Sequence, residues 1–82
     1  MEMKKRQIPD NRNLEGQYAN YFKVGNNAYE FVVDFGQFFP ENGKAEIYSR
    51  IVTSPAYTKA LVETLENALL RYEKQYGKIV LE

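Results

Sequence analysis

The sequence of 82 residues contains no histidine and no cysteine. The first absence removes the side chain that most often acts in acid–base catalysis and metal binding. The second excludes disulfides and thiolate metal sites. No hydroxyl lies in a nucleophile motif, the glycines are isolated, and the acidic residues lack calcium-loop spacing. We therefore predict a protein that is not an enzyme and that needs no cofactor or metal.

The chain also lacks an excess of charge and a long apolar run. Eleven basic residues balance eleven acidic ones, whereas a nucleic-acid binder normally carries a basic excess. No apolar segment approaches the roughly 20 residues of a membrane span, and residues 1–9 do not resemble a signal peptide. We expect a cytoplasmic protein without a membrane association, and nucleic acid is the less favoured partner.

Aromatic residues, in contrast, are abundant: seven Tyr and five Phe in one small domain. A chain of this size buries only about 60–65% of its unfolded surface, which leaves a thin margin of stability. Disulfides and thiolate metal sites are excluded, so self-association is the remaining way to gain stability. We predict a homodimer or a higher oligomer that works by contact.

The first 15 residues form a polar, flexible N-terminal arm in this interpretation, and residues 16–82 form a single domain. The arm is rich in lysine and arginine and shows no periodicity. It is interpreted either as a frayed, solubilising terminus or as a tether for an acidic surface.

Three segments alternate between apolar and polar residues, as strands do: residues 17–24, 28–35 and 45–53. Residues 25–27 (Gly-Asn-Asn) suit a tight hairpin with positive φ angles, and residues 36–44 are expected to form a long connection. Asp34 is predicted to meet Glu46 or Arg50 across neighbouring strands. The second strand should turn its aromatic face to the core through Tyr29, Phe31, Val33 and Phe35. In the third strand, Ile47, Ser49 and Ile51 should face one side, and Tyr48, Arg50 and Val52 the other.

A helix is predicted over residues 55–76, because Ser54 is a favoured N-cap, Pro55 suits the first turn and Gly77 suits the end. Its length of about 33 Å exceeds the roughly 26 Å of an eight-residue strand, so it should overhang the sheet. Residues 79–81 would add a short fourth strand or a partner contact. The apolar stripe of the helix is interpreted mainly as core, with a second role at an oligomer seam, and comprises Tyr57, Leu61, Leu65, Ala68, Tyr72 and Tyr76, extended by Val62 and Leu69.

The resulting fold class is α+β, β-β-β-α: an antiparallel meander of three strands, or four with residues 79–81, followed by one long C-terminal helix. A meander of this kind leaves two strand edges open, which favours pairing with another chain.

Some aromatic residues have no place in this core. Tyr21 and Lys23 share one face of the first strand, and Tyr48 and Arg50 share one face of the third. Such a face could stack single-stranded nucleic acid, or its tyrosines could pack against protein; the zero net charge favours packing. The candidate interaction surface is therefore Tyr21, Lys23, Phe38, Phe39, Tyr48 and Arg50.

Four segments in this order resemble a family of short prokaryotic proteins, the domain of unknown function 3467. They are residues 15–20 (EGQYAN), 30–36 (EFVVDFG), 49–55 (SRIVTSP) and 72–79 (YEKQYGKI). The resemblance implies a compact stand-alone protein and transfers no catalytic or binding residue. We predict a non-catalytic, oligomeric protein-interaction module, an adaptor or small chaperone-like protein; the alternative is a single-stranded nucleic-acid-binding protein that uses an aromatic and basic sheet face.

Overall fold

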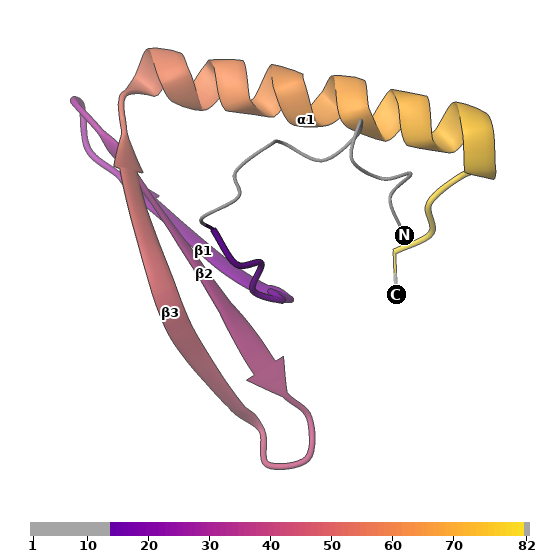
Figure 1. Cartoon of the computed structure of the whole chain (residues 1–82). Helices are drawn as coiled ribbons and strands as arrows, with labels where there is room; N and C mark the ends of the chain where they lie inside the picture. The colour runs from indigo at the N-terminus through magenta and orange to yellow at the C-terminus, as the bar shows by residue number, and fades with distance from the viewer. Residues whose placement is uncertain (1–13, 82) are drawn as a thin grey trace.

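A computed structural model describes residues 14–81 as one sheet followed by one helix (Figure 1). The strands are β1 (Tyr21–Asn26), β2 (Phe31–Phe39) and β3 (Lys44–Thr53), and the helix is α1 (Pro55–Tyr76). The sheet has the order β1-β2-β3, and both pairs of neighbours are antiparallel. The predicted β-β-β-α fold is thereby confirmed. Residues 1–13 of the predicted N-terminal arm lie outside the described residues.

The hairpin between β1 and β2 is built differently from the prediction. Residues 25 and 26 belong to β1, and the turn falls at residues 27–30. The Asn27 side-chain oxygen accepts hydrogen bonds from the backbone N–H groups of Tyr29 and Glu30, at 2.7 and 2.9 Å. Within residues 14–81, only Gly43 and Gly77 have a positive φ. The turn is therefore closed by a side chain, as Asx turns are, and the predicted positive φ angles are absent from it.

The long connection predicted over residues 36–44 is mostly strand. β2 continues through Phe39, and only residues 40–43 form the turn to β3. Gly43 has a φ of 67°, and its N–H donates to the Phe39 carbonyl at 2.9 Å. The two adjacent phenylalanines therefore both belong to β2, where successive side chains point to opposite faces.

α1 begins and ends where the sequence predicts. The Ser54 hydroxyl accepts a hydrogen bond from the Tyr57 N–H at 3.1 Å, and Pro55 occupies the first turn. At the other end, the Gly77 N–H donates to the Glu73 carbonyl at 2.9 Å, with a φ of 103° that suits glycine. Residues 79–81 lie in no strand, so the expected fourth strand does not form.

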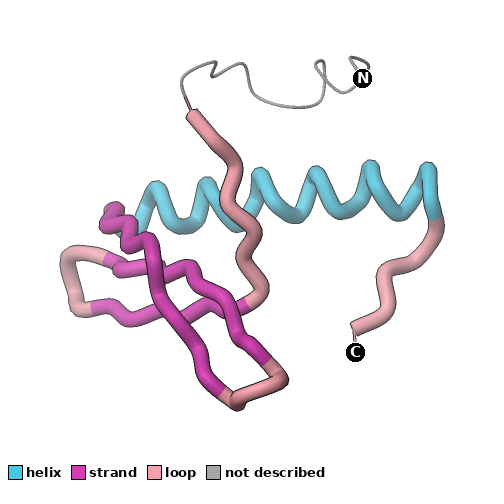
Figure 2. Tube along the Cα trace, turned by 60° about the horizontal axis from the view of Figure 1, so that its bottom comes forward, coloured by secondary structure: helices cyan, strands magenta, loops and turns pink. Residues whose placement is uncertain are grey.

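The predicted core is absent: no hydrophobic side chain within residues 14–81 is buried. Tyr29 is 84% exposed, and α1 contains no buried residue. The helix leaves the end of β3 and extends away from the sheet rather than across it, as Figures 1 and 2 both show. The radius of gyration is accordingly 15.3 Å, against about 12 Å for a compact domain of this length. The assignment of the helix stripe and the sheet face to a core within one chain was wrong.

The predicted overhang of the helix is also absent. β2 has 9 residues and β3 has 10, so these strands span about 30–33 Å. The 22 residues of α1 span about 33 Å. Helix and sheet therefore match in length, although they do not pack on each other.

Candidate protein interface

The sheet has one largely apolar face, which we call the inner face. Register pairs Phe22 with Phe35 and Val24 with Val33 between β1 and β2, and Val33 with Ile51 between β2 and β3. The Phe22 and Phe35 rings pack edge to face, with centroids 5.8 Å apart. This contact shows that residues paired in register share a face. The apolar residues that define the inner face are Phe22, Val24, Phe31, Val33, Phe35 and Ile51. Beyond residue 36 the same side of the sheet carries Gln37, Phe39, Glu46 and Lys44.

The helix has a matching apolar stripe, which remains open to solvent. Leu65, near its centre, is 54% exposed, and Tyr57 is 72% exposed. Tyr72 and Tyr76 stack on each other, with ring centroids 4.9 Å apart. The helix stripe comprises Tyr57, Leu61, Val62, Leu65, Ala68, Leu69, Tyr72 and Tyr76.

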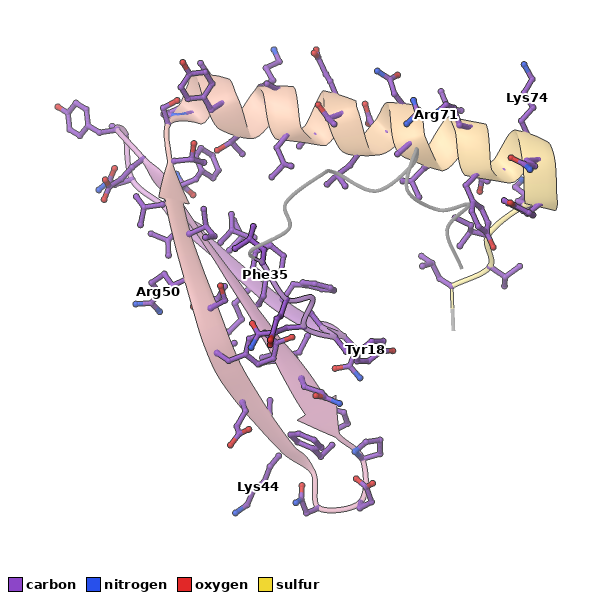
Figure 3. All side chains as sticks on the ribbon, in the orientation of Figure 1. Tyr18, Phe35, Lys44, Arg50, Arg71 and Lys74 are labelled. Atoms are coloured by element: carbon purple, nitrogen blue, oxygen red, sulfur yellow. The ribbon has the colours of Figure 1, made fainter. Side chains whose placement is uncertain are left out.

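The inner face and the helix stripe turn toward the same side of the molecule. In Figure 3 Phe35 lies on the side of the sheet below the helix, and Arg50 lies on the opposite side. Lys74 points away from the sheet in the same view. It is nine residues from Leu65, or two and a half turns, so Leu65 points toward the sheet side. Each chain thus presents two unpartnered apolar surfaces on its open side.

The other side of the sheet, the outer face, is organised around one ion pair. Asp34 lies opposite Lys23 on β1 and Arg50 on β3. Both carboxylate oxygens of Asp34 accept hydrogen bonds from the Arg50 guanidinium at 2.8 Å. Asp34 is only 7% exposed, the lowest value of any polar residue described, and the predicted cross-strand pair with Arg50 is confirmed. Arg50 itself remains largely exposed.

This arrangement changes the titration of both groups. The hydrogen bonds from Arg50, aided by the charges of Arg50 and Lys23, hold the pKa of Asp34 below its ordinary value of 3.8, against an opposing effect of desolvation. The same pair raises the pKa of Arg50. A carboxyl whose pKa is depressed by folding stabilises the fold above its unfolded pKa. That contribution is lost as the pH falls through the folded pKa.

We therefore expect Asp34→Asn to lower the urea midpoint of unfolding at pH 7, with a difference from wild type that shrinks toward pH 2. At acid pH the wild-type carboxyl is protonated as well, so the two side chains become equivalent in charge. Urea titrations at a series of pH values, at one protein concentration, measure this effect. Glu41→Gln, in the exposed turn between β2 and β3, is the control. A difference between Asp34→Asn and wild type that is constant with pH would contradict the assignment.

A β-bulge in β3 alters the predicted faces of that strand. Phe35 pairs with Ser49 but Gly36 pairs with Ile47, so Tyr48 has no partner in the register. Ile47 consequently lies on the outer face with Arg50, and its prediction on the side of Ser49 and Ile51 was wrong. A bulge inserts one residue and reverses the alternation beyond it. The Tyr48 hydroxyl donates to the backbone carbonyl of Tyr18, which ties residues 14–20 to the sheet.

The structure brings together four of the six predicted surface residues. Register and alternation place Tyr21, Lys23, Phe38 and Arg50 on the outer face. Phe39 lies on the other face, and Tyr48 occupies the bulge. Because Arg50 is paired with Asp34, the outer face is less basic than its sequence indicates.

Sequence reasoning missed the role of Asn20. Its side-chain oxygen accepts from the Phe38 N–H at 2.7 Å, and its side-chain amide donates to the Phe38 carbonyl at 3.4 Å. The Asn20 backbone N–H also donates to the Gly36 carbonyl at 3.1 Å. These bonds supply partners for the backbone N–H and C=O groups of β2 that lie beyond the end of β1. The sequence offered no clear signal, because Asn20 fell inside the strand predicted over residues 17–24; residues 17–20 in fact lie outside β1.

Within residues 14–81, no group of three acidic side chains is arranged to hold a metal ion. No helix in this part of the chain is long and apolar enough to cross a membrane.

Comparison with known proteins places the chain in a family. No curated protein and no solved structure matches the sequence. One family model does match, over residues 2–81, and its description is protein of unknown function. Since that match covers nearly the whole sequence, the chain belongs to the DUF3467 family.

Proposed function

We propose that this protein is a non-catalytic, homo-oligomeric module that binds other proteins. The observation that carries the proposal is the lack of any buried hydrophobic side chain within residues 14–81. A sheet with one apolar face must bury that face against another element to be stable in water. The inner face and the helix stripe are uncovered in the single chain, so folding and self-association are coupled in this proposal.

The outer face supplies the surface for other proteins. Phe38, Ile47 and Val52 are each exposed by about two fifths or more, and they surround a fixed ion pair. An apolar patch with a polar centre is typical of protein-binding surfaces. In this proposal the inner face and the helix stripe serve assembly, and the outer face serves an adaptor or small chaperone-like role in the cytoplasm.

The alternative, single-stranded nucleic-acid binding, would use the same outer face. Tyr21, Lys23 and Arg50 do share that face, as stacking on a basic surface requires. However, Asp34 pairs with Arg50 and also lies opposite Lys23. The Asp34 carboxylate neutralises part of the positive charge of this face and so weakens its attraction for phosphate, which favours protein as the partner.

Light scattering and circular dichroism along a dilution series test the assembly. From about 100 μM to about 0.1 μM, we expect the mass to fall to that of one chain and the secondary structure to be lost in the same range, because mass action dissociates the oligomer. The melting temperature should fall on dilution as well. A folded, strictly monomeric species at all concentrations would refute the proposal.

Binding by the outer face is tested on the assembled protein. Immobilised wild type and Val52→Glu are compared for retention of an unfolded, reduced model protein, and labelled single-stranded DNA is added to each at two salt concentrations. We expect retention of the unfolded protein by the wild type and its loss in the variant. Salt-sensitive DNA binding without protein retention would favour the alternative.

A further inference from the structure

We infer that the occupant of the open side is a second copy of this chain, with α1 of each copy lying across the inner face of its partner's sheet. The inference rests on the proposed self-association and specifies its geometry. The helix of each chain would pack on the sheet of the other chain, and the two chains would be related by one twofold axis.

The first step is that α1 is held away from its own sheet. Only Ser54 separates the last residue of β3 from the first residue of α1. Its hydroxyl caps the helix, its carbonyl accepts from the Thr58 N–H at 2.9 Å, and the Thr58 hydroxyl donates to the same carbonyl at 2.8 Å. Pro55 further restricts the backbone of Ser54, which is extended with a ψ of 163°. For α1 to fold back onto its own sheet, the hydrogen bonds that Ser54 makes to the first turn of the helix would have to break, and the backbone angles of Ser54 would have to change.

The second step is that helix and sheet fit each other. α1 and β3 are each about 33 Å long, and neither the helix stripe nor the apolar residues that define the inner face include a charge. The charged residues Glu46 and Lys44 lie on that side of the sheet only beyond the bulge, at the end of β3 that is distant from Ser54. Four of the six charged residues of α1 (Lys59, Glu63, Arg71 and Lys74) lie about 120° or more from Leu65 around the helix axis, and Glu66 and Glu73 lie about 100° and 80° from it, at one edge of the stripe. A helix laid on the inner face by its stripe would therefore keep four charges in water and place the other two at the rim of the contact.

The third step is that exchange covers both inner faces and both helix stripes at once. Pairing of helices alone would leave two inner faces exposed, and pairing of sheets alone would leave two helix stripes exposed. Reciprocal exchange is isologous and closed, so it ends at the dimer and leaves none of the four surfaces uncovered.

The area available is sufficient for a stable dimer. Ten residues of the two surfaces are about half exposed, and each offers on the order of 100 Å². They are Phe22, Val24, Ile51, Tyr57, Leu61, Val62, Leu65, Leu69, Tyr72 and Tyr76. Two copies would bury on the order of 2,000 Å², within the range of obligate dimers.

Engineered disulfides test this geometry, and the lack of native cysteine makes the experiment clean. Val33→Cys, at the centre of the inner face, is combined in one chain with Leu61→Cys, Leu65→Cys or Tyr72→Cys, so that one of three helix positions falls opposite it. After mild oxidation, denaturing non-reducing electrophoresis separates linked dimers from single chains. Circular dichroism confirms that each variant is folded before oxidation.

We expect at least one double variant to run mainly as a covalent dimer. The corresponding single variants should remain unlinked, and mixing a Val33→Cys chain with a tagged helix-cysteine chain should give the mixed dimer. Leu70→Cys, which is nine residues from Leu61 and therefore opposite it, replaces the helix cysteine as the control, and it should not link.

The other outcomes overturn the inference in distinguishable ways. An internal disulfide within one chain would show that α1 covers its own sheet. Links formed by single variants would show pairing of helices or of sheets, and an oligomer without any link would indicate pairing through strand edges; in both cases the proposed self-association would stand. A wild-type protein that is monomeric at all concentrations, together with double variants that form no link, would refute both the inference and the proposed self-association.

Discussion

Replacing Leu65 by glutamate should dissociate the protein and unfold it. Leu65 lies near the centre of the helix stripe, which the proposed assembly buries against a partner. A buried charge without a partner costs several kcal/mol. At about 3 kcal/mol per site, and with two sites in a symmetrical contact, the dissociation constant would rise by roughly 10⁴.

Leu70→Glu is the matched control for this prediction. Leu70 is on the same helix, is 65% exposed, and lies opposite Leu61, away from the stripe. The same substitution there should leave mass and melting temperature nearly unchanged, because surface substitutions are usually within about 0.5 kcal/mol. Light scattering and thermal melts at one concentration compare the two variants. If Leu65→Glu and Leu70→Glu have the same mass in solution and the same melting temperature, the helix stripe is not buried.

Replacing Gly36 by alanine should cause the largest loss of stability of any single methyl group added to the sheet. A Cβ atom at this position would lie 2.0 Å from the Glu46 carbonyl oxygen and 2.8 Å from its carbon. Those atoms belong to the backbone of β3 at the bulge, so no side chain can move aside. β2 and β3 would have to separate where their register shifts, at a cost of about 3 kcal/mol.

Gly25→Ala provides the comparison for Gly36→Ala. Gly25 is also in a strand, its φ is not positive, and nothing lies within 4 Å of an added Cβ. Alanine there should be neutral or stabilising by a few tenths of a kcal/mol, because it restricts the unfolded chain. Urea midpoints of the two variants at equal concentration measure the difference. If Gly36→Ala is as stable as Gly25→Ala, the close approach at the bulge does not exist in solution.

Local patterns predicted the bounds of α1 and the presence and order of the three strands, although β1 and β2 begin four and three residues later than predicted. The bounds of α1 follow from Ser54, Pro55 and Gly77, and the structure places them as predicted. The alternation of Phe31, Val33 and Phe35 identified a strand, and Asp34 with Arg50 identified a cross-strand pair. Caps and alternation act over a few residues, so one sequence is enough to recognise them.

Features that depend on pairing between strands were not predictable in this way. The turn at Asn27 and the bulge at Tyr48 depend on which backbone groups find partners, and the sequence shows neither the register nor its shift. The role of Asn20 likewise depends on the end of β1, beyond which the edge of β2 needs a hydrogen-bond partner. For this reason Phe39 and Ile47 were assigned to faces or segments that the structure corrects.

The sequence by itself determined which surfaces of this protein are apolar: one stripe of α1 and one face of β2 with its neighbours. It also determined that no disulfide could stabilise the fold, since cysteine is absent. Only the tertiary structure decided that these surfaces do not meet within one chain. The hydrophobic effect is non-directional, so a pattern states that a surface must be covered without stating by what. The capped, one-residue connection at Ser54 fixes the direction of α1, and that direction leaves both surfaces uncovered.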